Sequence, residues 1–79
     1  MPAATTDPNQ AAEAAERAKA VRAAVQALPD DMREAIILCE WEALPVAEAA
    51  TVLQSTPKAV ESRLYRARNL LREQLKKWL

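Results

Sequence analysis

The chain has 79 residues and contains no glycine, histidine or phenylalanine. This length is enough for one small domain, which buries only about 60% of the surface that its unfolded chain exposes. Alanine alone supplies 18 of the residues. Because alanine is the best helix former and tight hairpin turns require glycine, the composition excludes an all-β fold and a glycine-rich phosphate loop. We therefore expect an all-α protein.

The charge is balanced overall but divided unevenly along the chain. Residues 1–53 carry 4 basic and 9 acidic side chains, a net charge of −5, whereas residues 54–79 carry 7 basic and 2 acidic ones, a net charge of +5. Such asymmetry between the two halves of a chain is typical of a protein that presents one face to nucleic acid. Uneven charge also arises by chance in small helical domains, so charge alone leaves both interpretations open.

The residue types exclude most catalytic and metal sites. Without histidine, the chain cannot form a Ser-His or Cys-His pair, and its single cysteine, Cys39, argues against a structural zinc site. Cys39 lies in an apolar run, where we expect a small buried hydrophobic residue. We expect no catalytic residue, no cofactor, no metal and no small-molecule substrate. No apolar stretch approaches the ~18 residues that span a membrane, and the polar N-terminus is not a signal peptide, so we expect no membrane partner.

The first 27 residues divide into a leader and one helix. We expect residues 1–8 to form a disordered leader or linker. Asp7 and Pro8 are typical of a helix N-cap followed by a proline in the first turn. Small apolar residues recur with helical spacing over residues 9–27, which predicts a lead-in helix. The apolar stripe of this helix comprises Ala14, Ala18, Val21, Val25 and Leu28.

Prolines and aspartates separate the next two helices. Pro29 stops the first helix, and Asp30 and Asp31 suit the positive N-terminus of a second one. The second helix runs to Pro45, where a third begins and continues to about Leu53. So short a helix is not stable alone and must pack between its neighbours. The residues expected to be buried are Met32, Ala35, Ile36, Cys39 and Ala43 of the second helix, widened by Leu38 and Trp41, and Val46, Ala49, Ala50 and Leu53 of the third.

A longer, basic helix is predicted after the next break. Thr56 before Pro57 is again a cap followed by a first-turn proline, and the helix runs to about Trp78. Its apolar face comprises Val60, Leu64, Ala67, Leu71, Leu75 and Trp78. Its opposite face carries Lys58, Ser62, Tyr65, Arg66 and Asn69.

The last two helices together form a helix-turn-helix pattern. A short helix, a tight turn and a longer helix with a basic exposed face are typical of this motif, whose second helix enters the DNA major groove. The turn usually contains glycine. Here Gln54 or Ser55 is expected to adopt the left-handed conformation instead, at a cost of about 1 kcal/mol.

The most specific motif of the chain lies in the last helix. Residues 59–68 read AVESRLYRAR and are followed by Leu71-Arg72. From Leu28 onward, including Arg33-Glu34-Ala35 and the helix before Leu53, the chain resembles region 4 of the sigma-70 family, specifically of the extracytoplasmic-function group of bacterial sigma factors, whose signature is V-x-S-R-L-x-R-A-R. The resemblance implies an all-α fold of four helices with a C-terminal helix-turn-helix of the winged-helix-like or sigma region 4 type. Residues 28–79 are then the sigma region 4-like helix-turn-helix domain, and residues 9–27 are the lead-in helix before it.

The resemblance also implies a function and a set of contacts. In that family, region 4 recognises the −35 promoter element in transcription initiation and docks on the β flap of RNA polymerase, in the bacterial cytoplasm. An anti-sigma factor is a further candidate partner. Arg33 is expected at a phosphate, and Arg63 either contacts a phosphate or pairs with Glu48. Carried over by position, the residues expected against double-stranded promoter DNA are Arg33, Thr56, Lys58, Glu61, Ser62, Arg63, Tyr65 and Arg66.

The chain departs from the family pattern at three positions. The family often has lysine or arginine at the position of Glu61 and glycine at that of Lys58, and Pro45 replaces a serine-like cap. Glu61 cannot hold a phosphate, but its carboxylate can accept a hydrogen bond from a cytosine amino group. The preferred −35 sequence is therefore left open.

Other interpretations also remain open. The domain could bind an anti-sigma factor or RNA polymerase with its DNA binding weak or lost. It could also be the effector domain of a LuxR-type response regulator, against which the Arg66-Ala67-Arg68 motif and the glycine-free turn argue. A further alternative, less favoured than DNA contact, is that the arginines of the last helix form a solvated face that pairs with Glu61 and Glu73. Nothing in the chain resembles the domain that reads the −10 element, and 79 residues cannot hold both. We therefore expect an excised C-terminal domain rather than a stand-alone regulator.

Overall fold

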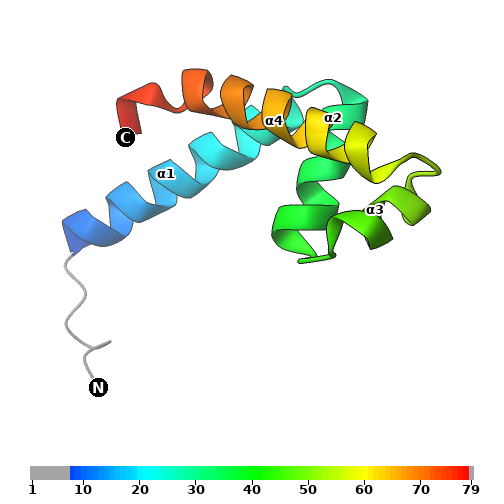
Figure 1. Ribbon diagram of the computed structural model, residues 1–79. Coiled ribbons are helices and arrows are strands. Elements are labelled where there is room, and N and C mark those ends of the chain that lie inside the picture. The colour runs from blue at the N-terminus through cyan, green and yellow to red at the C-terminus, as the bar shows by residue number, and fades with distance from the viewer. Residues whose placement is uncertain (1–7, 79) are drawn as a thin grey trace.

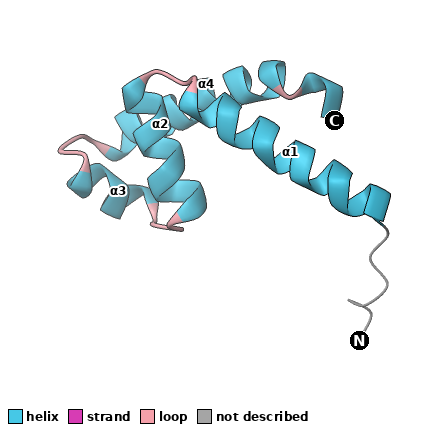
Figure 2. Cartoon of the chain, turned by 180° about the vertical axis from the view of Figure 1, so that it is seen from behind, coloured by secondary structure: helices cyan, strands magenta, loops and turns pink. Residues whose placement is uncertain are grey.

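The computed structural model describes residues 8–78, which form four α-helices (Figure 1). These are α1 (Pro8–Gln26), α2 (Asp30–Ile36), α3 (Val46–Val52) and α4 (Pro57–Gln74). A π-helical turn (Ile37–Trp41) continues α2, and a 3-10 turn (Lys76–Trp78) follows α4. Within residues 8–78 there is no strand, and the helices are joined by short loops (Figure 2). The predicted all-α, four-helix architecture is confirmed. The predicted leader lies outside the described residues except for Pro8, which is the first residue of α1.

The hydrophobic core lies where α2, α3 and α4 meet. Ala49 and Ala50 of α3 and the first part of the apolar face of α4 are buried as expected, and Val60 is completely buried. Val46 and Leu53, also predicted to be buried, are half-buried against this core. Half of the core cluster is alanine, so the helices approach closely while each residue buries little area. The cluster comprises Leu28, Ala35, Ile36, Ala49, Ala50, Val60, Leu64 and Ala67.

The helix α1 projects from this core as an arm (Figure 1). Its buried residues, Ala24 and Val25, lie in its last turn, and residues 8–19 are all exposed. The radius of gyration is 15.3 Å, compared with about 12 Å for a compact domain of this length. The predicted stripe is therefore wrong at Ala14 and Ala18, which are exposed, and right at its C-terminal end, where Val25 is buried.

The end of α2 also differs from the prediction. The Glu42 N–H donates to the Ile37 carbonyl at 2.9 Å, one residue further back than in an α-helix, and this bond forms the π-helical turn. Ala43 follows in the left-handed region, with φ of 58°. Because the wider turn shifts the residues after it around the helix axis, Ala43 is exposed, contrary to the prediction. Trp41, which was expected to widen the buried face of the second helix, is 55% exposed.

Candidate nucleic-acid interface

The N-terminus of α4 is fixed by a side-chain cap. The Thr56 hydroxyl oxygen accepts a hydrogen bond from the Ala59 N–H at 3.1 Å, and Pro57 occupies the first turn. Thr56 itself is extended, with φ of −104° and ψ of 155°. This arrangement is the cap and first-turn proline that the sequence predicts. It fixes the point at which α4 begins. Because Pro57 has no N–H, and the Ala59 and Val60 N–H groups both donate to Thr56, the Lys58 N–H is the one in this turn that is free to meet an anion.

The turn between α3 and α4 closes without glycine. Gln54 adopts the left-handed conformation, with φ of 54°. The Ser55 N–H donates to the Ala50 carbonyl at 2.8 Å, and the Gln54 N–H donates to the Thr51 carbonyl at 3.2 Å. These two bonds form a Schellman motif, which satisfies the last carbonyls of α3. Of the two residues considered from the sequence, Gln54 is therefore the one that carries the left-handed strain.

The face of α4 opposite the core is exposed and polar. Six of the eight residues predicted to lie against DNA are exposed on α4 or at its cap, and the structure brings them together over the first three turns of the helix. Tyr65 is 69% exposed, although it is aromatic. Within residues 8–78, Lys58 and Arg66 form no ion pair, so both positive charges are available to a ligand. The six are Thr56, Lys58, Glu61, Ser62, Tyr65 and Arg66.

Arg66 is held by its neighbour on this face. One guanidinium nitrogen, Nη2, donates to the Ser62 hydroxyl oxygen at 3.2 Å. Because the two residues are four apart, they lie on the same side of the helix. The guanidinium keeps most of its five N–H groups for a partner outside the chain, and arginine binds guanine through two such groups at once.

The remaining two predicted residues, Arg63 and Arg33, are less accessible. The Nε of Arg63 lies 3.7 Å from Asp31 Oδ2, and its side chain is 26% exposed. Its neighbour is therefore Asp31 of α2, not Glu48 of α3 as one alternative from the sequence held. The guanidinium of Arg33 donates to the carbonyls of Gln26 (3.2 Å) and Leu28 (3.3 Å).

Arg33 thus ties α2 to the end of α1. It also pairs with Asp30 within α2, and its side chain is 28% exposed. Since three groups of the protein already occupy its guanidinium, a phosphate contact by Arg33 would have to share or replace these bonds. Its expected phosphate contact stays a prediction.

Sequence reasoning missed a second tie between helices. Arg68 Nη2 donates to Glu40 Oε1 at 2.5 Å, which links α4 to the π-helical turn. The idea that the arginines of α4 pair along the helix with Glu61 and Glu73 is wrong for Arg63 and Arg68, whose carboxylate partners come from other elements. No periodicity within α4 could reveal these partners, because they lie about 30 residues earlier in the chain.

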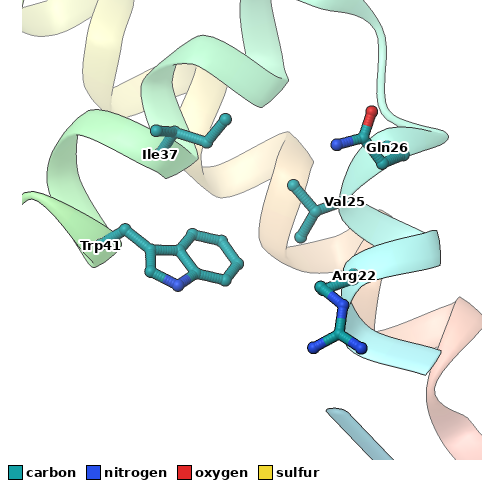
Figure 3. A pocket seen from close by; sticks show the side chains of 5 residues that line it. All are labelled: Arg22, Val25, Gln26, Ile37 and Trp41. Atoms are coloured by element: carbon teal, nitrogen blue, oxygen red, sulfur yellow. The ribbon is translucent and has the colours of Figure 1, made fainter. Parts of the chain in front are cut away.

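A groove lies between α1 and the π-helical turn, away from the exposed face of α4. It is a hollow of about 250 Å³ lined by Arg22, Val25, Gln26, Ile37 and Trp41. Figure 3 shows the Trp41 indole extending from the π-helical turn toward Val25 and Arg22 of α1. A second hollow, of about 450 Å³, continues along α1 past Arg17 and Val21 and is also bounded by Trp41. Trp41 and Arg22 line both hollows.

The described residues offer neither a metal cluster nor a membrane span. Over residues 8–78, no three carboxylate or cysteine side chains gather as a metal site would require. No helix in the same range combines the length and the apolar character needed to cross a bilayer.

Comparison with known proteins assigns the family. The family model described as "Sigma-70, region 4" matches residues 18–71, which take in the second half of α1, all of α2 and α3, and most of α4. The chain belongs to the sigma-70 region 4 family. The match decides between the two DNA-binding families considered from the sequence, and all eight predicted contact residues of the sigma-70 region 4 domain lie inside it. The first ten residues of the α1 arm lie outside it.

The sigma-70 region 4 domain is also similar to a curated protein. It is 41% identical over 51 residues to the RNA polymerase sigma-H factor of Pseudomonas aeruginosa. The aligned segment covers 65% of this chain and 26% of the sigma-H factor. The chain therefore spans about a quarter of the length of this relative.

Proposed function

We propose that this sigma-70 region 4 domain recognises the −35 element of bacterial promoters, as the DNA-binding domain of a sigma factor of the extracytoplasmic-function group. The observation that carries the proposal is the exposed face of α4, on which polar and basic side chains surround a capped helix N-terminus. A helix of about 10–12 Å diameter fits the major groove, which is about 12 Å wide. The family membership supports the same conclusion, since region 4 is part of the transcription machinery.

Five of the six residues of this face have roles that follow from their chemistry. Arg66 reads a guanine through two N–H groups, held in place by Ser62. Glu61 accepts a hydrogen bond from a cytosine amino group, and Lys58 neutralises a phosphate. Thr56 fixes the start of α4 so that the free backbone N–H of Lys58 faces a second phosphate. These phosphate contacts set the register of the helix, and the base contacts select the sequence.

The test is binding of the chain to a duplex that the chain itself selects from a randomised pool. The dissociation constant is measured across a salt series for the wild type, Arg66→Ala and the matched control Arg17→Ala. Arg17 is exposed on the α1 arm, and its loss changes the net charge by the same amount. We expect Arg66→Ala to weaken binding about tenfold or more, because a bidentate base contact contributes about 1–3 kcal/mol. We expect Arg17→Ala to leave the affinity nearly unchanged.

Three results would contradict the proposal. If the pool yields no preferred sequence, the domain does not read bases. If Arg66→Ala and Arg17→Ala weaken binding equally, the attraction depends on net charge and not on the face of α4. Binding that is insensitive to salt would also contradict it, since each phosphate contact contributes about −0.9 to the slope of log K against log salt.

A second function, protein docking, is favoured by the groove beside Trp41. Trp41 is 55% exposed and Ile37 is 36% exposed, and both line an apolar hollow that Arg22 also lines. Arg17 and Arg22 favour a partner that carries acidic residues next to apolar ones. We propose that this groove receives the β flap of RNA polymerase, and an anti-sigma factor is the alternative occupant.

Docking can be tested by titrating the labelled chain with bacterial RNA polymerase core enzyme. We expect Trp41→Ala to weaken this association about tenfold or more, since buried tryptophans often dominate an interface. Val52→Ala is the matched control, because Val52 is equally exposed but lies on α3, away from the groove. If Trp41→Ala and Val52→Ala weaken the association with core enzyme equally, the groove is not the docking site. If Trp41→Ala weakens the association with core enzyme but Arg66→Ala leaves the affinity for DNA unchanged, the results would favour an interaction module that lacks DNA recognition.

A further inference from the structure

Two arginines of α4 form ion pairs with carboxylates of α2 and of the π-helical turn that continues α2. Arg63 lies 3.7 Å from Asp31, in the first turn of α2, and Arg68 lies 2.5 Å from Glu40, in the π-helical turn that continues α2. The side chains of Arg68 and Glu40 are each about half exposed. Between these two ion pairs, α2 and α4 pack directly against each other.

The two arginines lie on opposite sides of the buried face of α4. At about 100° per residue, Arg63 projects about 60° to one side of the buried Val60, and Arg68 projects about 80° to the other. A rotation of α4 about its own axis that shortens one ion pair therefore lengthens the other. The two pairs together oppose rotation in both directions.

The buried contact combines large side chains, such as Val60 and Leu64, with alanines that constrain rotation less. The residues at which α4 meets its neighbours include Ala35, Ala49 and Ala67, all with no exposed surface. Alanine side chains are too short to interlock as leucine does, so at these positions the ion pairs add to the restraint that Val60 and Leu64 provide.

The rotation of α4 matters because its opposite face carries the residues proposed to read DNA. With a helix radius of about 5–6 Å including side chains, a rotation of about 20° moves a side-chain tip by about 2 Å. Hydrogen bonds to base edges tolerate only a few tenths of an ångström in donor–acceptor distance. Arg63 and Arg68 themselves project about 110° away from the centre of this face, which places both beside it and not on it.

We propose that Asp31–Arg63 and Glu40–Arg68 are positioning pairs that fix the rotation of α4 and thereby its base selectivity. Arg63 then acts through Asp31 and not by contacting a phosphate. The inference rests on the proposed DNA recognition by α4, because selectivity is the property that the two pairs control.

The experiment compares the affinity of each variant for the selected duplex with its affinity for a scrambled duplex, across a salt series. Arg63→Gln and Asp31→Asn are each expected to lower this affinity ratio about tenfold, and the double variant is expected to be no worse than either single one. Arg68→Gln and Glu40→Gln are expected to behave in the same way. The salt slope should stay as in the wild type, since neither arginine contacts a phosphate.

Matched controls and a charge swap separate positioning from simple charge effects. Glu34→Gln on α2 and Arg72→Gln on α4 change the charge of the same helices, and neither residue pairs between helices within residues 8–78, so the affinity ratio should not change. Exchanging the charges, with Asp31→Arg and Arg63→Asp together, should restore the ratio. A fall of about 0.9 in the salt slope for Arg63→Gln, with equal weakening for both duplexes, would overturn the proposal in favour of a phosphate contact.

A measurement without DNA keeps this proposal distinct from the proposed function. Residual dipolar couplings of backbone amides report how α4 is oriented relative to α2 in the free protein. We expect them to change in the Asp31→Asn/Glu40→Gln double variant while the helical circular dichroism stays the same. Unchanged couplings would overturn the positioning proposal even if the wild type reads DNA. Changed couplings in a chain that selects no duplex would overturn DNA recognition and leave the role of the pairs in orienting α4.

Discussion

The helices α1 and α4 are almost equal in length, with 19 and 18 residues, but they are held in place by different forces. α4 has a side-chain cap and buries Val60, Leu64 and Ala67 along its length. α1 buries only Ala24 and Val25, in its last turn. Eight of the 19 residues of α1 are alanine, so its helix depends mainly on intrinsic propensity, which is marginal in water for this length. The difference shows that α4 is part of the cooperative core, whereas most of α1 is not.

The largest expected effect comes from shortening a buried side chain of α4. Leu64→Ala should lower the free energy of unfolding by about 2–5 kcal/mol, because it leaves a cavity in the core. A domain of this size has only about 4–12 kcal/mol in total, so urea denaturation will measure the loss easily. Leu70→Ala on the same helix is the control, since Leu70 is largely exposed and should cost well under half as much. Equal losses would show that α4 is not anchored by its buried face.

A smaller effect is expected at the cap of α4. Thr56→Ala removes the hydroxyl that accepts from the Ala59 N–H and should destabilise the domain by about 1 kcal/mol. Thr56→Ser keeps the hydroxyl and should stay close to the wild type. Thermal and urea unfolding followed by circular dichroism measure both variants. If Thr56→Ala proved neutral, the start of α4 would have to be fixed by Pro57 and core packing alone.

The smallest expected effect on global stability comes from breaking α1. Ala18→Pro removes a helical hydrogen bond and clashes with the preceding turn, so the arm N-terminal to residue 18 should lose its helix. The helical circular dichroism should fall, but the free energy of unfolding should change by less than about 0.5 kcal/mol, because residues 8–19 bury nothing in the core. Ala67→Pro, within the buried face of α4, should instead unfold the domain. A large global loss in Ala18→Pro would mean that the arm is coupled to the core.

The fold could be predicted where large apolar residues alternate with polar ones at helical spacing. Val60 and Leu64 in α4, and the alanines of α3 between larger neighbours, were placed correctly for this reason. Ala14 and Ala18 were placed wrongly because alanine favours a helix whether or not it is buried, so its spacing carries no information about burial. The π-helical turn was also missed. This turn depends on which carbonyl accepts the hydrogen bond of the Glu42 N–H, and no residue type in the sequence indicates that partner.

The candidate site also has parts that the sequence predicts and parts that it does not. The exposed face of α4 follows from its period of 3.6 residues, and the cap at Thr56 follows from the Thr-Pro pair, so both could be predicted from the sequence alone. The partner of Arg63 could not. Asp31 and Arg63 are 32 positions apart, and their approach depends on how α2 crosses α4, whereas the sequence pointed to Glu48 on the neighbouring helix.

Two helices of this chain end on left-handed residues that carry a Cβ atom, Ala43 and Gln54. Each such residue costs about 1–2 kcal/mol relative to glycine, which adopts this conformation freely. In a domain of this size, about 1 kcal/mol corresponds to a melting temperature change of about 4–8 °C. Replacing Ala43 or Gln54 by glycine should therefore raise the melting temperature of the domain. Neither residue lies on the exposed face of α4.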